Sequence, residues 1–119
     1  MITQHPNGNN IRLHNIYSGR SFLETAQAIE KQSFGGHADE LETSIILALD
    51  ESLVKMEFAR SPIESKLKPI SKGLFNRTNP EETGYSPDGV NGDPSLGTKE
   101  KGVRLLKALK ADCLSIFSG

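Results

Sequence analysis

Turn-forming residues fill a long central stretch of this chain and leave little room for regular structure there. Between residues 60 and 95 the sequence is punctuated by Ser-Pro, Lys-Pro, Asn-Pro, Ser-Pro-Asp-Gly and Gly-Asp-Pro, and proline and glycine interrupt both helices and strands. We therefore predict one long loop from Ser61 to Pro94. A loop of that length in a small domain is either functional or a sign that the chain depends on a partner.

The apolar residues outside this loop define where a core can form. Hydrophobic residues make up only 35% of the 119-residue chain, so we expect one domain with a small core. Apolar residues at 11–16 indicate one short strand. Ser21 and Glu24 have the spacing of a capping box and predict a helix over residues 22–32.

Two further helices are expected, one on each side of the loop. The first carries the spacing i, i+4, i+7, i+8 of a buried stripe, formed by Leu41, Ile45, Ala48 and Leu49. Asp50 and Ser52 are expected to recap the chain into a further turn. The last helix begins at Asp93-Pro94 or at Thr98. Its expected apolar face consists of Val103, Leu106, Leu109, Cys113, Leu114 and Phe117.

Composition argues against several classes of function. The net charge is −1 with both signs interspersed, which is not the charge pattern of a nucleic-acid-binding protein. The longest apolar run, from Ile45 to Leu49, is far shorter than the ~20 residues that cross a bilayer. Cys113 is the only cysteine, which excludes an intrachain disulfide and a cysteine-rich zinc cluster. The N-terminus has no secretory signal pattern, so we expect a cytoplasmic protein.

The segment Gly35–Ser44 gathers proton-active side chains at the start of the second helix. His37 stands before the expected first turn, whereas Glu42 lies inside it. Because His37 is not yet bound to helical geometry, its imidazole and the Glu42 carboxylate can converge on one point. Such a pair can move a proton to a departing nitrogen or help to hold a cation. The spacing alone leaves three alternatives open: helix capping by the acidic residues, binding of an anion or a metal, and catalysis.

Two blocks of the sequence carry a family resemblance. Residues 36–44 have the sequence GHADELETS, and residues 89–102 have the sequence GVNGDPSLGTKEKG. In this order, the two blocks resemble the GHAG-x-x-ETS and GV-x-GDP-x-x-AT-x-EKG segments of the creatininase family, also called creatinine amidohydrolases. The resemblance covers roughly residues 34–117 in outline, and residues 1–33 match poorly.

The resemblance implies a metal-dependent hydrolase that cleaves a C–N amide bond in a small cyclic or linear amide. It further implies a three-layer α/β/α fold around a mostly parallel sheet, oligomeric assembly, and two divalent ions, usually zinc with manganese or iron as variants. A water molecule that bridges the ions attacks the carbonyl carbon. By the same resemblance, His37 contacts the substrate and assists proton transfer to the leaving nitrogen. Glu42 supports that histidine or the metal shell.

The family's main metal ligands have no counterpart in this chain. The resemblance implies a Glu-x-His pair, a later Asp and a His in an Asn-Gly-His-Gly loop, and none of these is present. We expect His5 and His14 to be exposed loop histidines, and Asp39 replaces a motif glycine. The expected structure is therefore a partial, helix-dominated α/β fold. It corresponds to the later portion of a single incomplete creatininase-like domain, with Glu42 as the one metal ligand that the resemblance indicates.

Two functional classes stay open. In the first, the chain contributes His37 and Glu42 to an amidohydrolase site for a small-molecule substrate and is not active alone. An N-terminal half or another subunit of a homo-oligomer then completes the site and its divalent metal. In the second, the chain is a non-catalytic remnant or interaction subunit of such an enzyme. A further alternative, anion binding at Gly35-Gly36, is opposed by the acidic side chains around it.

Overall fold

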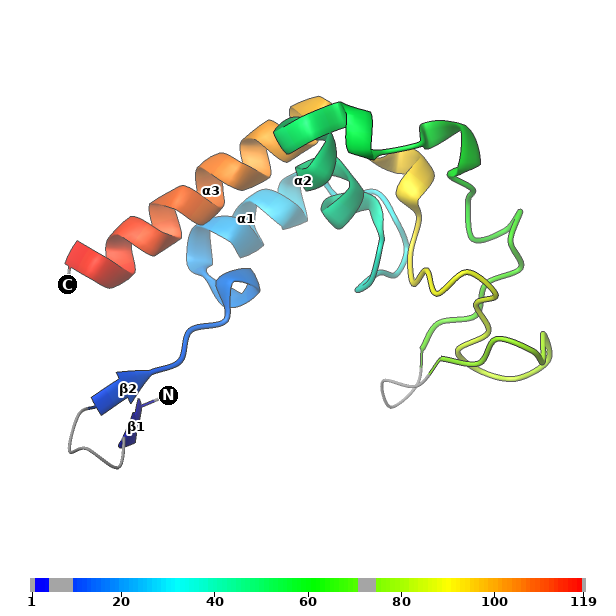
Figure 1. Ribbon diagram of the computed structural model, residues 1–119, viewed down its shortest axis with the longest axis horizontal. Coiled ribbons are helices and arrows are strands. Elements are labelled where there is room, and N and C mark those ends of the chain that lie inside the picture. The colour runs from blue at the N-terminus through cyan, green and yellow to red at the C-terminus, as the bar shows by residue number, and fades with distance from the viewer. Residues whose placement is uncertain (1, 5–9, 71–74, 119) are drawn as a thin grey trace.

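The computed structural model describes residues 2–4, 10–70 and 75–118 (Figure 1). Three α-helices pack together: α1 (Arg20–Ile29), α2 (Glu40–Asp50) and α3 (Lys99–Ser118). An antiparallel hairpin of β1 (Ile2–Gln4) and β2 (Asn10–Arg12) pairs Ile2 with Arg12. Figure 1 shows this hairpin and the long loop at opposite ends of the helical group.

The N-terminal strand is shorter than predicted. β2 ends at Arg12, and a 3-10 turn, η1 (Ile16–Ser18), follows soon after it. The side chain of Asn15 accepts a hydrogen bond from the Tyr17 amide at 2.9 Å. The prediction of one strand over 11–16 was therefore wrong beyond Arg12, because a short polar side chain stabilises a local turn instead of an extended chain.

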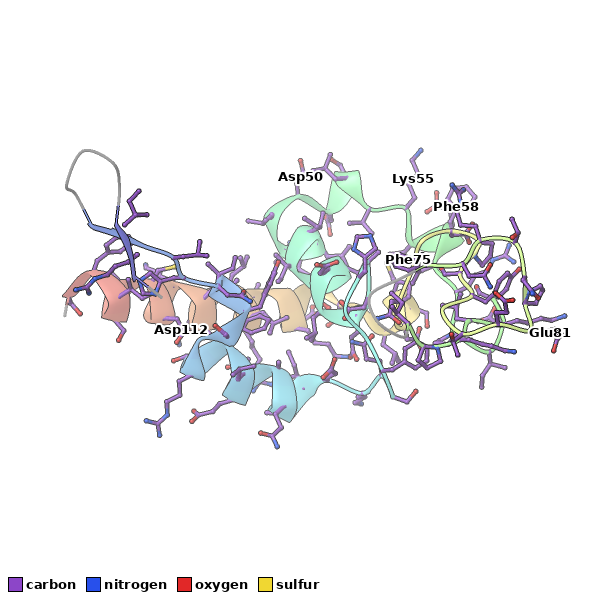
Figure 2. All side chains as sticks on the ribbon, turned by 90° about the horizontal axis from the view of Figure 1, so that it is seen from below. Asp50, Lys55, Phe58, Phe75, Glu81 and Asp112 are labelled. Carbon is purple, nitrogen blue, oxygen red and sulfur yellow. The ribbon has the colours of Figure 1, made fainter. Side chains whose placement is uncertain are left out.

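Helix α1 is capped from another helix. It spans residues 20–29 instead of 22–32, and the three apolar positions that predicted it are buried: Phe22, Ala26 and Ile29. Ser21 is not the N-cap. The Asp112 carboxylate of α3 accepts hydrogen bonds from the amides of Ser21 and Phe22, each at 2.9 Å (Figure 2). The predicted capping box was wrong because this distant carboxylate takes its place.

Helix α2 starts and ends where the sequence predicted. Asp39 is its N-cap, and Asp50 caps a further 3-10 turn, η2 (Glu51–Leu53), by accepting a hydrogen bond from the Ser52 amide at 3.0 Å. Of the predicted stripe, Ile45 is buried whereas Leu49 is 62% exposed. The stripe extends over more of the helix surface than α1 and α3 cover.

Both predicted starts of the last helix are used, each by a different element. Asp93 caps a short 3-10 turn, η4 (Pro94–Leu96), by accepting a hydrogen bond from the Ser95 amide at 3.1 Å. The Thr98 hydroxyl accepts a hydrogen bond from the Lys101 amide at 3.2 Å. Helix α3 itself therefore begins just after Thr98.

The face that helix α3 turns to the core overlaps the predicted one only in part, since Leu106 and Leu109 pack against the core. Its buried positions are Gly102, Leu105 and Ala108. Three predicted positions are largely exposed: Val103 (53%), Leu114 (59%) and Phe117 (87%). A Cβ atom on Gly102 would collide with the Ser44 carbonyl and with Ala48. The backbones of α2 and α3 therefore come closest at Gly102, and this approach turns the positions i+3 and i+6 from it toward the core.

The core is small and lies between the three helices. It consists of Phe22, Ala26, Ile29, Ile45 and Leu105, with Leu41, Leu106 and Leu109 packed against it. The radius of gyration is 16.8 Å, whereas a compact domain of this length has about 13–14 Å. The extended shape reflects the hairpin and the loop, which add little to the core.

The helix-dominated fold with a long loop is as predicted. A 3-10 turn, η3 (Met56–Phe58), precedes the loop, and the described residues from 61 to 93 contain turns and isolated bridges without a helix or strand. The three-layer arrangement around a parallel sheet is not found in the part of the chain that the structure describes, where β1 and β2 form the one sheet. None of the described helices has both the length and the apolar composition to span a membrane.

Candidate functional site

The two motif blocks meet at His37 and Asn91. These residues form an isolated antiparallel bridge, in which the His37 amide donates to the Asn91 carbonyl at 3.2 Å and the Asn91 amide donates to the His37 carbonyl at 2.8 Å. The Asn91 side chain also donates to the Gly35 carbonyl at 2.9 Å. Segments more than fifty residues apart in the sequence are thus joined next to the predicted catalytic imidazole.

The backbone around His37 is tightly constrained. Gly36 has φ 144° and Ala38 has φ 50°. The first value is accessible only to glycine, and the second is uncommon for alanine. Strained residues of this kind persist only when the surrounding structure holds them. His37 therefore stands in a turn whose geometry is fixed by its neighbours.

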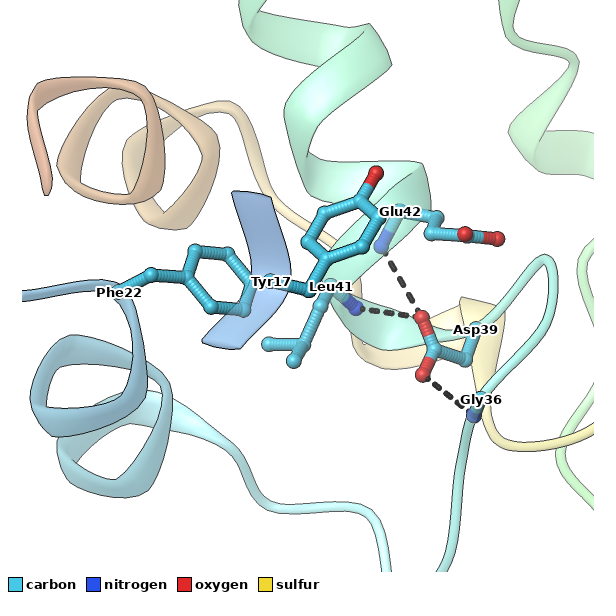
Figure 3. Close-up of a pocket in the computed structure, with 6 residues that line it drawn as sticks. All are labelled: Tyr17, Phe22, Gly36, Asp39, Leu41 and Glu42. Atoms are coloured by element: carbon cyan, nitrogen blue, oxygen red, sulfur yellow. Dashed lines mark hydrogen bonds between the residues drawn. The ribbon is translucent and has the colours of Figure 1, made fainter. Parts of the chain in front are cut away.

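Asp39 caps α2 with both carboxylate oxygens (Figure 3). Oδ1 accepts hydrogen bonds from the amides of Leu41 and Glu42 at 3.1 and 3.0 Å, and Oδ2 accepts one from the Gly36 amide at 2.9 Å. The side chain is 4% exposed. Capping, one of the three alternatives that the sequence left open, is therefore confirmed for Asp39.

Glu42 also accepts a backbone hydrogen bond. Its Oε2 accepts from the Ala38 amide at 2.6 Å, so the carboxylate is held against the turn that contains His37. Figure 3 shows that it points away from Phe22, although Glu42 contributes to the lining of an open, largely apolar hollow of about 190 Å³. The hollow is lined by Tyr17, Phe22, Gly36, Asp39, Leu41 and Glu42.

The imidazole of His37 has a different neighbour. It is exposed, and it packs edge-on against Phe75 of the loop with ring centroids 5.6 Å apart. Among the described residues, no hydrogen bond joins His37 to Glu42, and His37 does not line the hollow beside Glu42. His37 lies in the turn before α2 and Glu42 in the first turn of α2, while their convergence on a common ligand stays a prediction.

Glu40 and Lys101 form a buried ion pair that the sequence did not indicate. The Glu40 side chain is fully buried, and the Lys101 ammonium donates to its Oε2 at 2.5 Å and to the Leu96 carbonyl at 2.9 Å. The other carboxylate oxygen, Glu40 Oε1, accepts hydrogen bonds from the amides of Lys31 and Gln32 at 2.8 and 2.9 Å. Desolvation opposes the charged form, but these hydrogen bonds outweigh it and hold the pKa of Glu40 below its usual value. Glu40 lies in the first motif block and Lys101 in the second. This placement is the one feature of the sequence that could have indicated their contact.

The donors of the described residues do not by themselves form a metal site. In residues 2–4, 10–70 and 75–118, no group of three or more histidine, cysteine or acidic side chains is placed to hold one. The Asp39 oxygens and Glu42 Oε2 are engaged by N–H donors, whereas a zinc centre has at least three protein ligands. His5 lies outside the described residues, and His14 is exposed as expected.

The family comparison extends the resemblance that the two blocks indicated. The model of the creatininase family, described as creatinine amidohydrolase, matches residues 6–117. The match begins near the N-terminus and is not confined to residues 34–117, so the expected limit of the resemblance was wrong. No curated protein and no solved structure matches the chain significantly. Because the family model covers nearly the whole length, the chain belongs to the creatinine amidohydrolase family.

Proposed function

We propose that this chain takes part in hydrolysis of the C–N bond of a small cyclic or linear amide, and that His37 delivers the proton to the leaving nitrogen. The observation that carries the proposal is the placement of His37. Its imidazole is exposed on a turn that the two motif blocks build together. An imidazole that is accessible while its backbone is fixed suits general acid–base catalysis.

In this proposal the first role of Glu42 is to hold the turn that contains His37, and ligand binding is secondary. Its hydrogen bond to the Ala38 amide supports the backbone on the C-terminal side of His37. A role of Glu42 as ligand of a divalent metal, zinc or alternatively manganese or iron, would use Oε1, because Oε2 accepts the hydrogen bond from Ala38. It also requires that other ligands come from outside the described residues.

The site is completed elsewhere, either by a complementing N-terminal segment or by another subunit of a homo-oligomer. Large apolar side chains remain exposed on α2 and on the turns after it, including Leu49 (62%), Leu53 (70%) and Phe58 (69%). Exposed apolar surface of this kind marks interaction sites. The proposed partners are a small amide substrate and such a protein segment, in the cytoplasm, with neither nucleic acid nor membrane involved.

A second candidate function is that of a non-catalytic interaction subunit. It is favoured by the engagement of Asp39 and Glu42 in hydrogen bonds to the turn and helix start, which accounts for both acids without a ligand. On that view the chain retains the helix-packing surface of the family and contributes no reacting group.

Complementation separates the two functions. The chain alone is expected to hold far less than stoichiometric zinc and to cleave neither creatinine nor a formylated amine. Together with a complementing N-terminal segment that carries the Glu-x-His and Asn-Gly-His motifs, it should gain metal and amidase activity, and His37→Ala should then lower the rate roughly 10²–10⁴-fold. His14→Ala, at another exposed histidine, should not change the rate. Full activity of the His37→Ala complex would refute the proposed role.

A further inference from the structure

The side chain of Gln32 joins three segments that surround His37. Its Oε1 accepts hydrogen bonds from the Asp93 amide at 2.9 Å and from the Glu40 amide at 3.1 Å. Its Nε2 donates to Asp39 Oδ2 at 2.8 Å and to Glu30 at 2.6 Å. A primary amide has two donor hydrogens and one oxygen with two lone pairs, so the bonding capacity of Gln32 is fully used.

Two glycines allow the chain to close around this amide. A Cβ atom on Gly92 would lie 2.6 Å from Gln32 Oε1 and 2.5 Å from the Asp39 Cβ, and one on Gly35 would collide with Gln32 Nε2. Both contacts are too short for any other residue without displacement of the amide. The backbone before His37 and the backbone beside its bridge partner Asn91 therefore both approach Gln32 closely.

The bonds of Gln32 reach His37 from two directions. Through Asp93, Gln32 fixes the turn that contains Asn91, whose backbone pairs with His37. Through Asp39 Oδ2, which also accepts from the Gly36 amide, it fixes the residue that precedes His37. The residue that precedes His37 and the turn that pairs with it are thus both linked to one side chain.

We propose that Gln32, which lies outside both motif blocks, is the positioning residue that sets the place of His37 relative to the second block. This inference rests on the proposed function, since it concerns the histidine to which that function assigns the proton transfer. Gln32 itself touches no substrate in this proposal. It acts through the backbone of the Asn91 turn and through Asp39.

Hydrogen exchange and NMR spectroscopy of the whole chain test the proposal. Gln32→Met keeps the length of the side chain and removes its amide, while Gln27→Met makes the same change at an exposed position of α1. In Gln32→Met the amides of His37 and Asn91 should exchange about tenfold faster, and the His37 ring protons should lose the shift caused by Phe75. The amide of Leu105 in the core should change much less, and Gln27→Met should change none of these signals.

Equal acceleration at Leu105 and at His37 would overturn the proposal, because it would indicate only a general loss of stability. Unchanged exchange at His37 and Asn91 would overturn it too. If Gln32→Met does not fold, the unsubstituted chain decides. Its Gln32 side-chain amide protons should exchange slowly and show nuclear Overhauser contacts with Asp39, and averaged signals without these contacts would refute the role. Absence of amidase activity in the complemented protein would count against the proposed function. It would leave the hydrogen-exchange and NMR results for Gln32 unaffected.

Discussion

The carboxylate of Glu40 is charged in a fully buried place and is held by donors from two other parts of the chain. The amides of Lys31 and Gln32 follow α1, and the ammonium of Lys101 comes from α3. A buried charge is tolerated only when it is paired and its lone pairs are used. Glu40 therefore couples the end of α1, the start of α2 and the start of α3.

Removal of the cation should be costly. In Lys101→Met the buried Glu40 carboxylate loses its partner, and the free energy of unfolding should fall by about 3–5 kcal/mol. Urea denaturation followed by circular dichroism measures this change. Lys99→Met, at an exposed lysine in the first turn of the same helix, should alter stability by less than about 0.5 kcal/mol. Equal unfolding midpoints for the two variants would contradict the role of the ion pair.

The buried carboxylate of Glu40 also makes the stability of the fold depend on pH. Because the pKa of Glu40 is lower in the folded chain than in the unfolded one, its contribution is complete above the unfolded value of about 4.3. It is lost as the pH falls through the folded pKa. Asp112 acts in the same direction, since hydrogen bonds from Phe22 and Ser21 outweigh desolvation and lower its pKa.

Urea denaturation between pH 6 and pH 3 tests this dependence. The unsubstituted chain should lose stability as the solution is acidified below about pH 4.5. Glu40→Gln should lose less over the same interval, because its amide does not titrate. Parallel curves for the two proteins would show that Glu40 does not contribute.

At the scale of elements, the contact between α2 and α3 orders the helical group. Gly102 lets the α3 backbone approach the Ser44 carbonyl, and the Ser44 hydroxyl accepts a hydrogen bond from the Thr98 amide at 3.0 Å. The same hydroxyl donates to the Glu40 carbonyl at 2.6 Å. The point at which α2 and α3 cross is thus fixed by Gly102, which has no side chain, and by the buried hydroxyl of Ser44.

Gly102→Ala should destabilise the fold despite favouring the helix. Alanine is about 1 kcal/mol better than glycine in a helix interior, but here its methyl group forces α2 and α3 apart, which should cost a net of about 1–3 kcal/mol. The change in melting temperature on thermal unfolding shows whether Gly102→Ala stabilises or destabilises the fold. Val103→Ala, at the neighbouring exposed position, should have little effect. A higher melting temperature for Gly102→Ala would mean that the helices do not approach as described.

At the scale of the whole molecule, the chain buries few of its large apolar side chains. Those left largely exposed lie on α2, on the 3-10 turns after it, in the loop and on α3, among them Leu49, Leu53, Phe58, Ile63 and Phe117. The radius of gyration of 16.8 Å agrees with this extended, sparsely packed arrangement.

The isolated chain should therefore self-associate or be poorly soluble. Light scattering over a range of concentrations should show a mass above that of the monomer. The double change Leu49→Asn with Phe117→Asn should shift the mass toward the monomer, while Ser115→Asn at an exposed polar position of α3 should not. A clean monomer for the unsubstituted chain at every concentration would contradict this prediction.

The sequence by itself determined those features that depend on near neighbours. The position of α2, the caps at Asp50 and Thr98, and the long loop all rest on residues within a few positions of one another, and each is found where it was predicted. Capping by Asp39 was one of the three alternatives that the spacing left open. Of the apolar stripe of α2, Ile45 is buried whereas Leu49 is exposed. Local hydrogen bonds and proline geometry act before any tertiary contact exists. The family motifs also lie in the sequence alone and led to the correct family.

Only the tertiary structure decided which residues far apart in the sequence contact one another. Asp112 caps α1 across 91 positions, Lys101 neutralises Glu40 across 61, and Asn91 pairs with His37. These partners leave no periodic signal, because each depends on how the helices cross. The crossing at Gly102 likewise selected Leu105 over the predicted Val103 for the core, since the closest approach of two backbones depends on the shapes of both helices.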